Sequence, residues 1–183
     1  MVSMNGACRG WRVWGLNALV WVAMAGSPQA RAGVHEHGVV KLDVAVDGNV
    51  LTLQLEAPLD SLLGFEHRPR TQAQRQAAQA VLKRINDGAS LFQPSRAASC
   101  TFSKSTFDAD ALQSNPAAKP GEHADLDAIF EFQCAQPDKL RDIDVALFDA
   151  FKRIQRINAQ VIGPKGQALR TLKRPDRLLK LSR

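Results

Sequence analysis

Several residue patterns that mark common functions are missing from this 183-residue chain. No serine stands in a Gly-x-Ser-x-Gly turn and no glycine-rich phosphate loop is present, so the sequence indicates no enzyme. No Cys-x-x-Cys pair occurs, and no basic segment alternates with aromatic residues as in nucleic-acid-binding grooves. Beyond residue 26 no apolar run approaches the roughly 20 residues that cross a bilayer. We therefore predict neither catalysis, nor nucleic-acid binding, nor stable membrane insertion of the processed chain.

The first 32 residues have the pattern of a secretory signal peptide. Arg9 and Arg12 form a short positive region, and an uncharged, mostly apolar run follows from Val13 to Gly26. Ala30-Arg31-Ala32 then places small residues where signal peptidase cuts. An uncleaved membrane anchor is the alternative, which the short run and the cleavage pattern disfavour. We predict an exported protein with a mature chain of residues 33–183.

Removal of residues 1–32 lowers the net charge of the chain. The whole chain has a net charge of +6, and the signal segment holds three arginines and no acidic residue, so the mature chain carries +3. This excess lies mostly between Lys165 and Arg183. Such a tail can contact phosphates or a membrane surface, although a solvated chain end is the simpler interpretation. The mature 151 residues suffice for one hydrophobic core.

The cysteine content agrees with export. Cys8 leaves with the signal peptide, and Cys100 and Cys134 remain as a pair. In an oxidising compartment an even pair favours a disulfide, which here closes a loop of about 35 residues. A zinc-thiolate site is the alternative, but it lacks the usual close spacing of ligands.

Alternating apolar residues predict a β-hairpin at the start of the mature chain. Residues 40–46 and 51–55 each alternate with period two, and Asp47-Gly48-Asn49 between them is a turn sequence. Pro58 ends the second strand, and 59–65 is predicted as a short helical segment.

A longer helix follows. Thr71 and Gln74 have the spacing of a capping box, and Asn86-Asp87-Gly88 is the expected stop. The predicted apolar stripe of this helix consists of Ala73, Ala77, Ala80, Val81, Leu82 and Ile85.

The remaining strands complete an α+β prediction. Strands are expected at residues 100–103, 128–134, 157–161 and 168–172, separated by an aperiodic loop from about 108 to 121. We predict one α+β domain of antiparallel strands with two or three short helices. The two halves, about 33–108 and 122–183, each contain an alternating strand that ends at a proline before an apolar patch. An internal duplication and a chance similarity both explain this pattern. Only the duplication predicts two similar strand–helix lobes.

The histidines are the best candidates for chemistry. His35 and His37 are separated by Glu36, and an extended segment directs both imidazoles to one side, where they can share a metal ion. Two more acidic–histidine pairs are available, Glu66-His67 and Glu122-His123, and a carboxylate can either bind a metal or fix the tautomer of a histidine. The candidate metal residues are His35, Glu36, His37, Glu66, His67 and His123. Exposed polar residues with no ligand are the alternative.

A different metal site depends on the position at which signal peptidase cleaves the chain. If cleavage follows Ala32, the mature chain begins Gly33-Val34-His35. Its amino group, two amide nitrogens and one imidazole could surround copper or nickel in a plane, a geometry that suits those ions and not zinc.

The sequence resembles the ZrgA-like family of zinc-regulated bacterial periplasmic proteins. The matching stretches are His35-Glu36-His37-Gly38, 62–67 (Leu-Leu-Gly-Phe-Glu-His), Cys100, 132–137 with Cys134, and 144–148 followed by Phe151. This resemblance implies a periplasmic, zinc-binding protein that assists zinc uptake, beside a zinc transporter component. It also implies a metal role for His35, His37 and His67, and pairing of the two cysteines.

One departure from the family pattern affects how many zinc ions the protein can bind. Relatives commonly carry a histidine-rich insert between the two cysteine strands, and here the span 108–125 holds His123 alone. A tract that collects several zinc ions is therefore missing. We expect a single zinc site or, as the alternative, a non-metal envelope adaptor that contacts a partner through strand edges or its basic tail.

Overall fold

The computed structural model describes residues 36–112, 125–164 and 166–181. The chain divides into two units, 1–33 and 34–183, and the predicted signal peptide lies outside the described residues. The helices are α1 (Leu59–Leu63), α2 (Gln72–Asn86), α3 (Gly88–Leu91) and α4 (Leu147–Ala150), with 3-10 turns η1 (Arg96–Ala98) and η2 (Pro137–Lys139). The strands are β1 (Val39–Asp47), β2 (Val50–Pro58), β3 (Phe92–Pro94), β4 (Cys100–Asp108), β5 (Asp125–Cys134), β6 (Asp142–Val145), β7 (Arg156–Gly163), β8 (Gly166–Lys173) and β9 (Leu178–Lys180).

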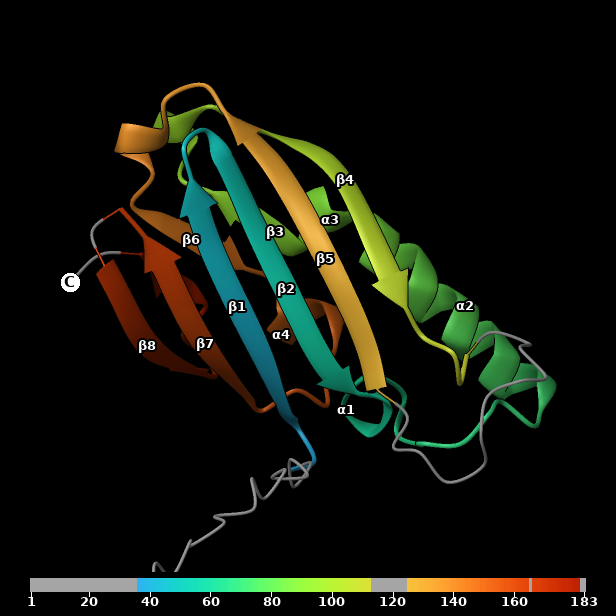
Figure 1. Ribbon diagram of the computed structural model, residues 1–183. Coiled ribbons are helices and arrows are strands. Elements are labelled where there is room, and N and C mark those ends of the chain that lie inside the picture. Colours follow the sequence, from blue (N-terminus) through green and yellow to red (C-terminus); the bar gives the residue numbers. More distant parts are fainter. Residues whose placement is uncertain (1–35, 113–124, 165, 182–183) are drawn as a thin grey trace, which may run out of the picture. The chain divides into compact units, whose positions relative to one another are not determined.

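A six-stranded sheet dominates the fold, with strand order β4-β5-β2-β1-β7-β8. A second sheet of order β3-β6-β9 lies behind one face of it, together with α4 (Figure 1). The apolar positions of the large sheet face this layer, so that Leu42, Leu53 and Phe130 are fully buried. The opposite face carries the polar alternate residues, as expected for a sheet with one side in water. The predicted α+β class is confirmed.

The predicted hairpin is also confirmed. Strands β1 and β2 pair from Lys41↔Glu56 to Asp47↔Val50, around a two-residue loop in which Gly48 has φ +56°. A positive φ at this loop position favours glycine. The sequence prediction missed one pairing, because β1 runs parallel to β7, from Val39↔Arg156 to Ala45↔Ile162. The backbone carbonyl of Gly38 accepts from the N–H groups of Gln155 and Arg156, which sets the two strands side by side at the same end.

The capping box of α2 is confirmed, with the Thr71 hydroxyl accepting from the Gln74 N–H and the Gln74 side chain accepting from the Thr71 N–H. The predicted apolar stripe is partly wrong. Val81 and Ile85 are buried, but Ala73, Ala77 and Ala80 are exposed and Ala78 is buried instead. The reason is geometric: α2 lies beside the edge strand β4 rather than across the sheet, so only a narrow stripe is covered (Figure 1).

Helix α2 ends at the predicted stop, Asn86-Asp87-Gly88. The helix ends at Asn86 with Asp87 as its cap, and Gly88 begins α3. A Cβ built on Gly88 would lie 2.5 Å from the Phe102 ring and 2.6 Å from the Phe130 ring. Glycine is therefore required here for close packing against two aromatic side chains, and not for a left-handed backbone. Within the described ranges, no helix is long and apolar enough to cross a membrane.

Candidate metal centre

The predicted site residues divide between two short segments. Glu36 and His37 lie just before β1, and Glu66 and His67 lie just after α1. His35, His123 and the Gly33-Val34-His35 segment proposed for copper or nickel lie outside the described residues.

A turn at the start of β1 positions His37. The Val39 N–H donates to the Glu36 carbonyl at 3.0 Å, and Gly38 at the third turn position has φ +78°. This positive φ favours glycine in such turns. A Cβ on Gly38 would also lie 3.1 Å from the Arg153 carbonyl oxygen. The Gly38 N–H donates to the buried Ser61 hydroxyl at 3.0 Å, so the turn is tied to α1.

The His37 ring lies between two carboxylates. Its Nδ1 is 3.5 Å from Asp60 Oδ2, and its Nε2 is 3.5 Å from Glu66 Oε1. The three side chains differ in exposure, with His37 at 70%, Glu66 at 39% and Asp60 at 13%. One ring nitrogen therefore faces a nearly buried carboxylate, and the other faces an accessible carboxylate at the surface.

Arg153 holds Asp60 in place. The arginine Nε donates to the Asp60 backbone carbonyl at 2.8 Å, and its second nitrogen contacts Asp60 Oδ1 at 3.1 Å. Gly64, with φ +86°, ends α1 and leaves room for the guanidinium, because a Cβ there would lie 3.2 Å from the arginine Cζ. Since Asp60 already balances Arg153, it suits the role of orienting His37 better than that of a metal ligand.

Glu36 and His67 have other partners. Glu36 forms an ion pair with Arg156 at the start of β7. The His67 ring stacks on Phe65 with centroids 5.1 Å apart, and its Nδ1 lies 2.8 Å from the Arg68 carbonyl oxygen. A carbonyl can only accept, so Nδ1 is the donor in this contact, and Nε2 of the neutral imidazole has the lone pair.

His37 and Glu66 are the described residues that could together hold a metal ion. Across the described part of the chain, no group of three His, Cys, Asp or Glu side chains is placed to hold one ion. His37 Nε2 and Glu66 form a nitrogen–oxygen pair of the kind zinc accepts, while a zinc site usually has four ligands. A carboxylate behind the other ring nitrogen, as Asp60 is here, is the common companion of a zinc-bound histidine.

Sequence reasoning missed Asp60, Arg153 and Ser61. Asp60 lies 23 residues from His37, and Arg153 lies 93 residues from Asp60, so no local spacing connects them. The one available signal was Asp60 itself, the acidic residue in the first turn of a short apolar helix.

Cys100 and Cys134 form a disulfide, as predicted. The two residues are directly paired across β4 and β5. Because both sulfurs are consumed in the bond, the zinc-thiolate alternative does not apply to this state of the protein.

Comparison with known proteins identifies the family. A family model described as "ZrgA family zinc uptake protein" matches residues 34–181, which include both site segments and both cysteines. No curated protein matches the sequence. The chain belongs to the ZrgA family.

Proposed function

We propose that this ZrgA family member is a non-catalytic periplasmic protein that binds zinc and assists its uptake beside a transporter. The observation that carries the proposal is the His37 imidazole held between Asp60 and Glu66. The family description supports the connection to zinc uptake. The signal-peptide pattern of residues 1–32 supports export.

The two ring nitrogens of His37 take different roles in this proposal. Nδ1–H donates to Asp60, which fixes the tautomer and leaves the Nε2 lone pair directed at the surface. Zinc then binds between Nε2 and Glu66, because imidazole nitrogen and carboxylate oxygen are both ordinary zinc ligands. Arg153 holds Asp60 in place without itself approaching the ion.

The remaining ligands come from nearby residues or from water. His35, two residues before His37 in the sequence, is a further candidate ligand. His67 follows Glu66 and keeps a free Nε2 lone pair. An exposed site with few fixed ligands suits a protein that passes its ion to a partner, because release is then not slowed by a closed coordination shell.

Zinc titration of the mature protein by calorimetry tests the proposal. We expect one site with a Kd below about 100 μM, which corresponds to about 5.5 kcal/mol. His37→Ala should weaken binding at least tenfold through loss of a ligand. Asp60→Asn should weaken it by about 10- to 100-fold through loss of the orienting carboxylate.

A matched control separates the site from general surface charge. Glu66→Gln removes the proposed carboxylate ligand, and Glu56→Gln removes a carboxylate that pairs with Lys41 elsewhere on the surface. Only the first should weaken binding. His67→Ala should have a smaller effect than His37→Ala, because the His67 ring stacks on Phe65. Wild-type protein with no binding tighter than about 100 μM, or equal losses for both glutamate variants, would disprove the zinc site.

A further inference from the structure

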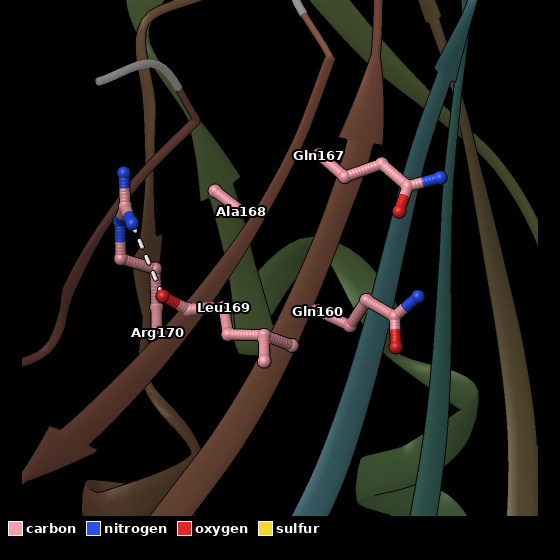
Figure 2. Close-up of a pocket in the computed structure, with 5 residues that line it drawn as sticks. All are labelled: Gln160, Gln167, Ala168, Leu169 and Arg170. Atoms are coloured by element: carbon pink, nitrogen blue, oxygen red, sulfur yellow. Dashed lines mark hydrogen bonds between the residues drawn. The ribbon is translucent and has the colours of Figure 1, made fainter.

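Two arginines near the end of β8 make different kinds of contact. Figure 2 shows a shallow pocket on β7 and β8, which is lined by Gln160, Gln167, Ala168, Leu169 and Arg170. In this pocket the Arg170 guanidinium donates to the Leu169 carbonyl oxygen at 3.1 Å, a contact between neighbouring residues of one strand. Arg174, just beyond the end of β8, instead donates to a residue 20 positions earlier in the chain. Arg174 therefore connects separate segments of the fold.

The guanidinium of Arg174 binds several backbone carbonyls at once. Its Nε donates to the Ile154 carbonyl at 3.1 Å, and Nη2 contacts the carbonyls of Phe148 and Phe151 at 2.6 and 3.3 Å. Its carbon also lies 5.1 Å from the centroid of the Phe148 ring. A planar guanidinium suits this arrangement because its donors are held in a fixed fork. Arg174 thereby fixes the backbone of residues 151–155, the connection between α4 and β7.

The 151–155 connection also reaches the His37 site, at two points. From its middle, the Arg153 side chain donates to the Asp60 backbone carbonyl at 2.8 Å and contacts the Asp60 carboxylate at 3.1 Å. At its end, the backbone N–H groups of residues 155–156 donate to the Gly38 carbonyl at 2.7 and 3.0 Å. Asp60 faces Nδ1 of His37, and Gly38 follows His37 directly. The connection therefore holds both the carboxylate behind the imidazole and the backbone that carries the imidazole.

The contact between Arg153 and Asp60 depends on a fixed backbone. The Arg153 side chain is 54% exposed, and an exposed ion pair contributes little when its long side chain must be ordered for the contact to form. Phe151 and Ile154, on either side of Arg153, are buried and anchor the connection to the core. Arg174 binds the carbonyls of the same two residues. Side chain and backbone together thus hold Arg153 at one position relative to Asp60.

We propose that Arg174 is a positioning residue for the zinc site. It fixes the 151–155 connection, from which Arg153 reaches Asp60. Asp60 in turn orients the His37 imidazole toward the ion, so that less ordering is needed when zinc binds. The inference rests on the proposed zinc site and extends its support to a residue more than 100 positions away in the sequence.

A double-mutant cycle measured by zinc calorimetry tests this inference. Arg174→Lys keeps the positive charge but replaces the fork with a compact ammonium, which does not span the same carbonyls. We expect the Kd for zinc to rise by about three- to tenfold. In an Arg153→Met background, the same change should raise the Kd by less than about twofold, because the connection no longer reaches the Asp60 side chain. Arg174→Gln, whose amide keeps two donors, is a second variant with the same expectation.

Arg177 provides the matched control. It belongs to the same C-terminal segment as Arg174, but it pairs with the carboxylates of Asp144 and Asp149 and not with carbonyls of the 151–155 connection. Arg177→Lys should lower the unfolding midpoint in urea and leave the Kd for zinc unchanged. Arg174→Lys should change both quantities. This comparison separates positioning of the site from general destabilisation, which both variants cause.

Amide hydrogen exchange of the metal-free protein, measured by NMR, tests the positioning without zinc. The Gly38 N–H donates to the buried Ser61 hydroxyl, so its exchange rate reports how firmly the turn that carries His37 is held. We expect faster exchange at Gly38 in Arg174→Lys and an unchanged rate in Arg177→Lys.

Three results would overturn the inference. The first is an unchanged Kd for zinc in both Arg174 variants, and the second is an equal rise of the Kd in Arg174→Lys and Arg177→Lys. The third is a full effect of Arg174→Lys in the Arg153→Met background, which would mean that Arg153 does not transmit it. Wild-type protein that binds no zinc contradicts the proposed function instead. The Gly38 exchange rates then decide the inference by themselves, and equal rates in wild type and Arg174→Lys reject it.

Discussion

The two edges of the six-stranded sheet are constructed in different ways. The β4 edge has a register shift between Phe102 and Lys104, a disulfide to β5 and a hydroxyl contact from Ser105 to the last residue of α2. The β8 edge has no register shift, no disulfide and an exposed leucine at its centre. Bulges and covering helices are devices that prevent strand addition. The comparison indicates that the β4 edge is protected against strand addition by devices that the described residues do not place on the β8 edge.

The β4 edge should be the more costly edge to disturb, and its disulfide gives the largest effect. Replacing Cys100 and Cys134 with serine frees a loop whose ends are 34 residues apart. The chain-entropy relation gives a loss of about 4 kcal/mol in the free energy of unfolding. Urea denaturation of the double variant measures this loss. A loss below about 1 kcal/mol would remove the disulfide as the main stabilising feature of this edge.

The close packing of Gly88 against β4 gives the next largest effect. Gly88→Ala places a methyl group closer than van der Waals contact to the Phe102 and Phe130 rings. Overpacking of this kind lowers the free energy of unfolding by about 1–3 kcal/mol. Gly163→Ala is the matched control beside β8, since its Cβ would lie 3.6 Å from Val46 in ordinary contact. The control should change the unfolding free energy by less than about 0.5 kcal/mol. Equal losses would mean that helix or strand propensity, and not packing, determines both results.

The sequence predicted the local features of both edges better than their surroundings. The hairpin of β1 and β2 and the Thr71–Gln74 capping box depend on neighbouring residues, so the period and the turn chemistry reveal them. The parallel β1–β7 pair depends on Gly38 meeting Gln155, and the position of Asp60 depends on Arg153. These contacts join segments that lie about a hundred residues apart, and one sequence contains no signal for them. The histidine pattern therefore predicted His37 and Glu66 as candidates, but not the carboxylate and arginine that orient them.

A carboxylate row distinguishes the β4 half of the sheet from the basic β8 half. Asp127 on β5 pairs with Asp108 on one side and Glu56 on the other. Burial raises the pKa of Asp127, the negative charges of Glu56 and Asp108 raise it further, and Lys41 opposes them. Because the folded state raises this pKa, the ionised carboxylate disfavours folding above the ordinary aspartate pKa of about 3.9, and the penalty vanishes below it.

Asp127→Asn should therefore stabilise the protein at pH 7. Solvent screening on this face limits the gain to about 0.5 kcal/mol. Thermal unfolding at pH 7 and pH 3 measures the effect, and the difference from wild type should disappear at the lower pH. Asn158→Asp is the control on the β8 half. The new carboxylate lies beside Lys41 across β1 and β7, so it should not lower the free energy of unfolding as the Asp127 carboxylate does. A stabilisation by Asp127→Asn that persists at pH 3 would contradict the electrostatic explanation.

Leu169 gives the smallest expected effect on stability and the clearest distinction between the edges. Its side chain is 77% exposed, so Leu169→Thr removes almost no buried apolar area, and threonine suits a strand. The unfolding midpoint in urea should therefore match wild type within error. A residue required for stability would lower the midpoint instead. A clear loss of stability in Leu169→Thr would show that the leucine side chain contributes to packing at the β8 edge, as Phe102 and Phe130 do near β4.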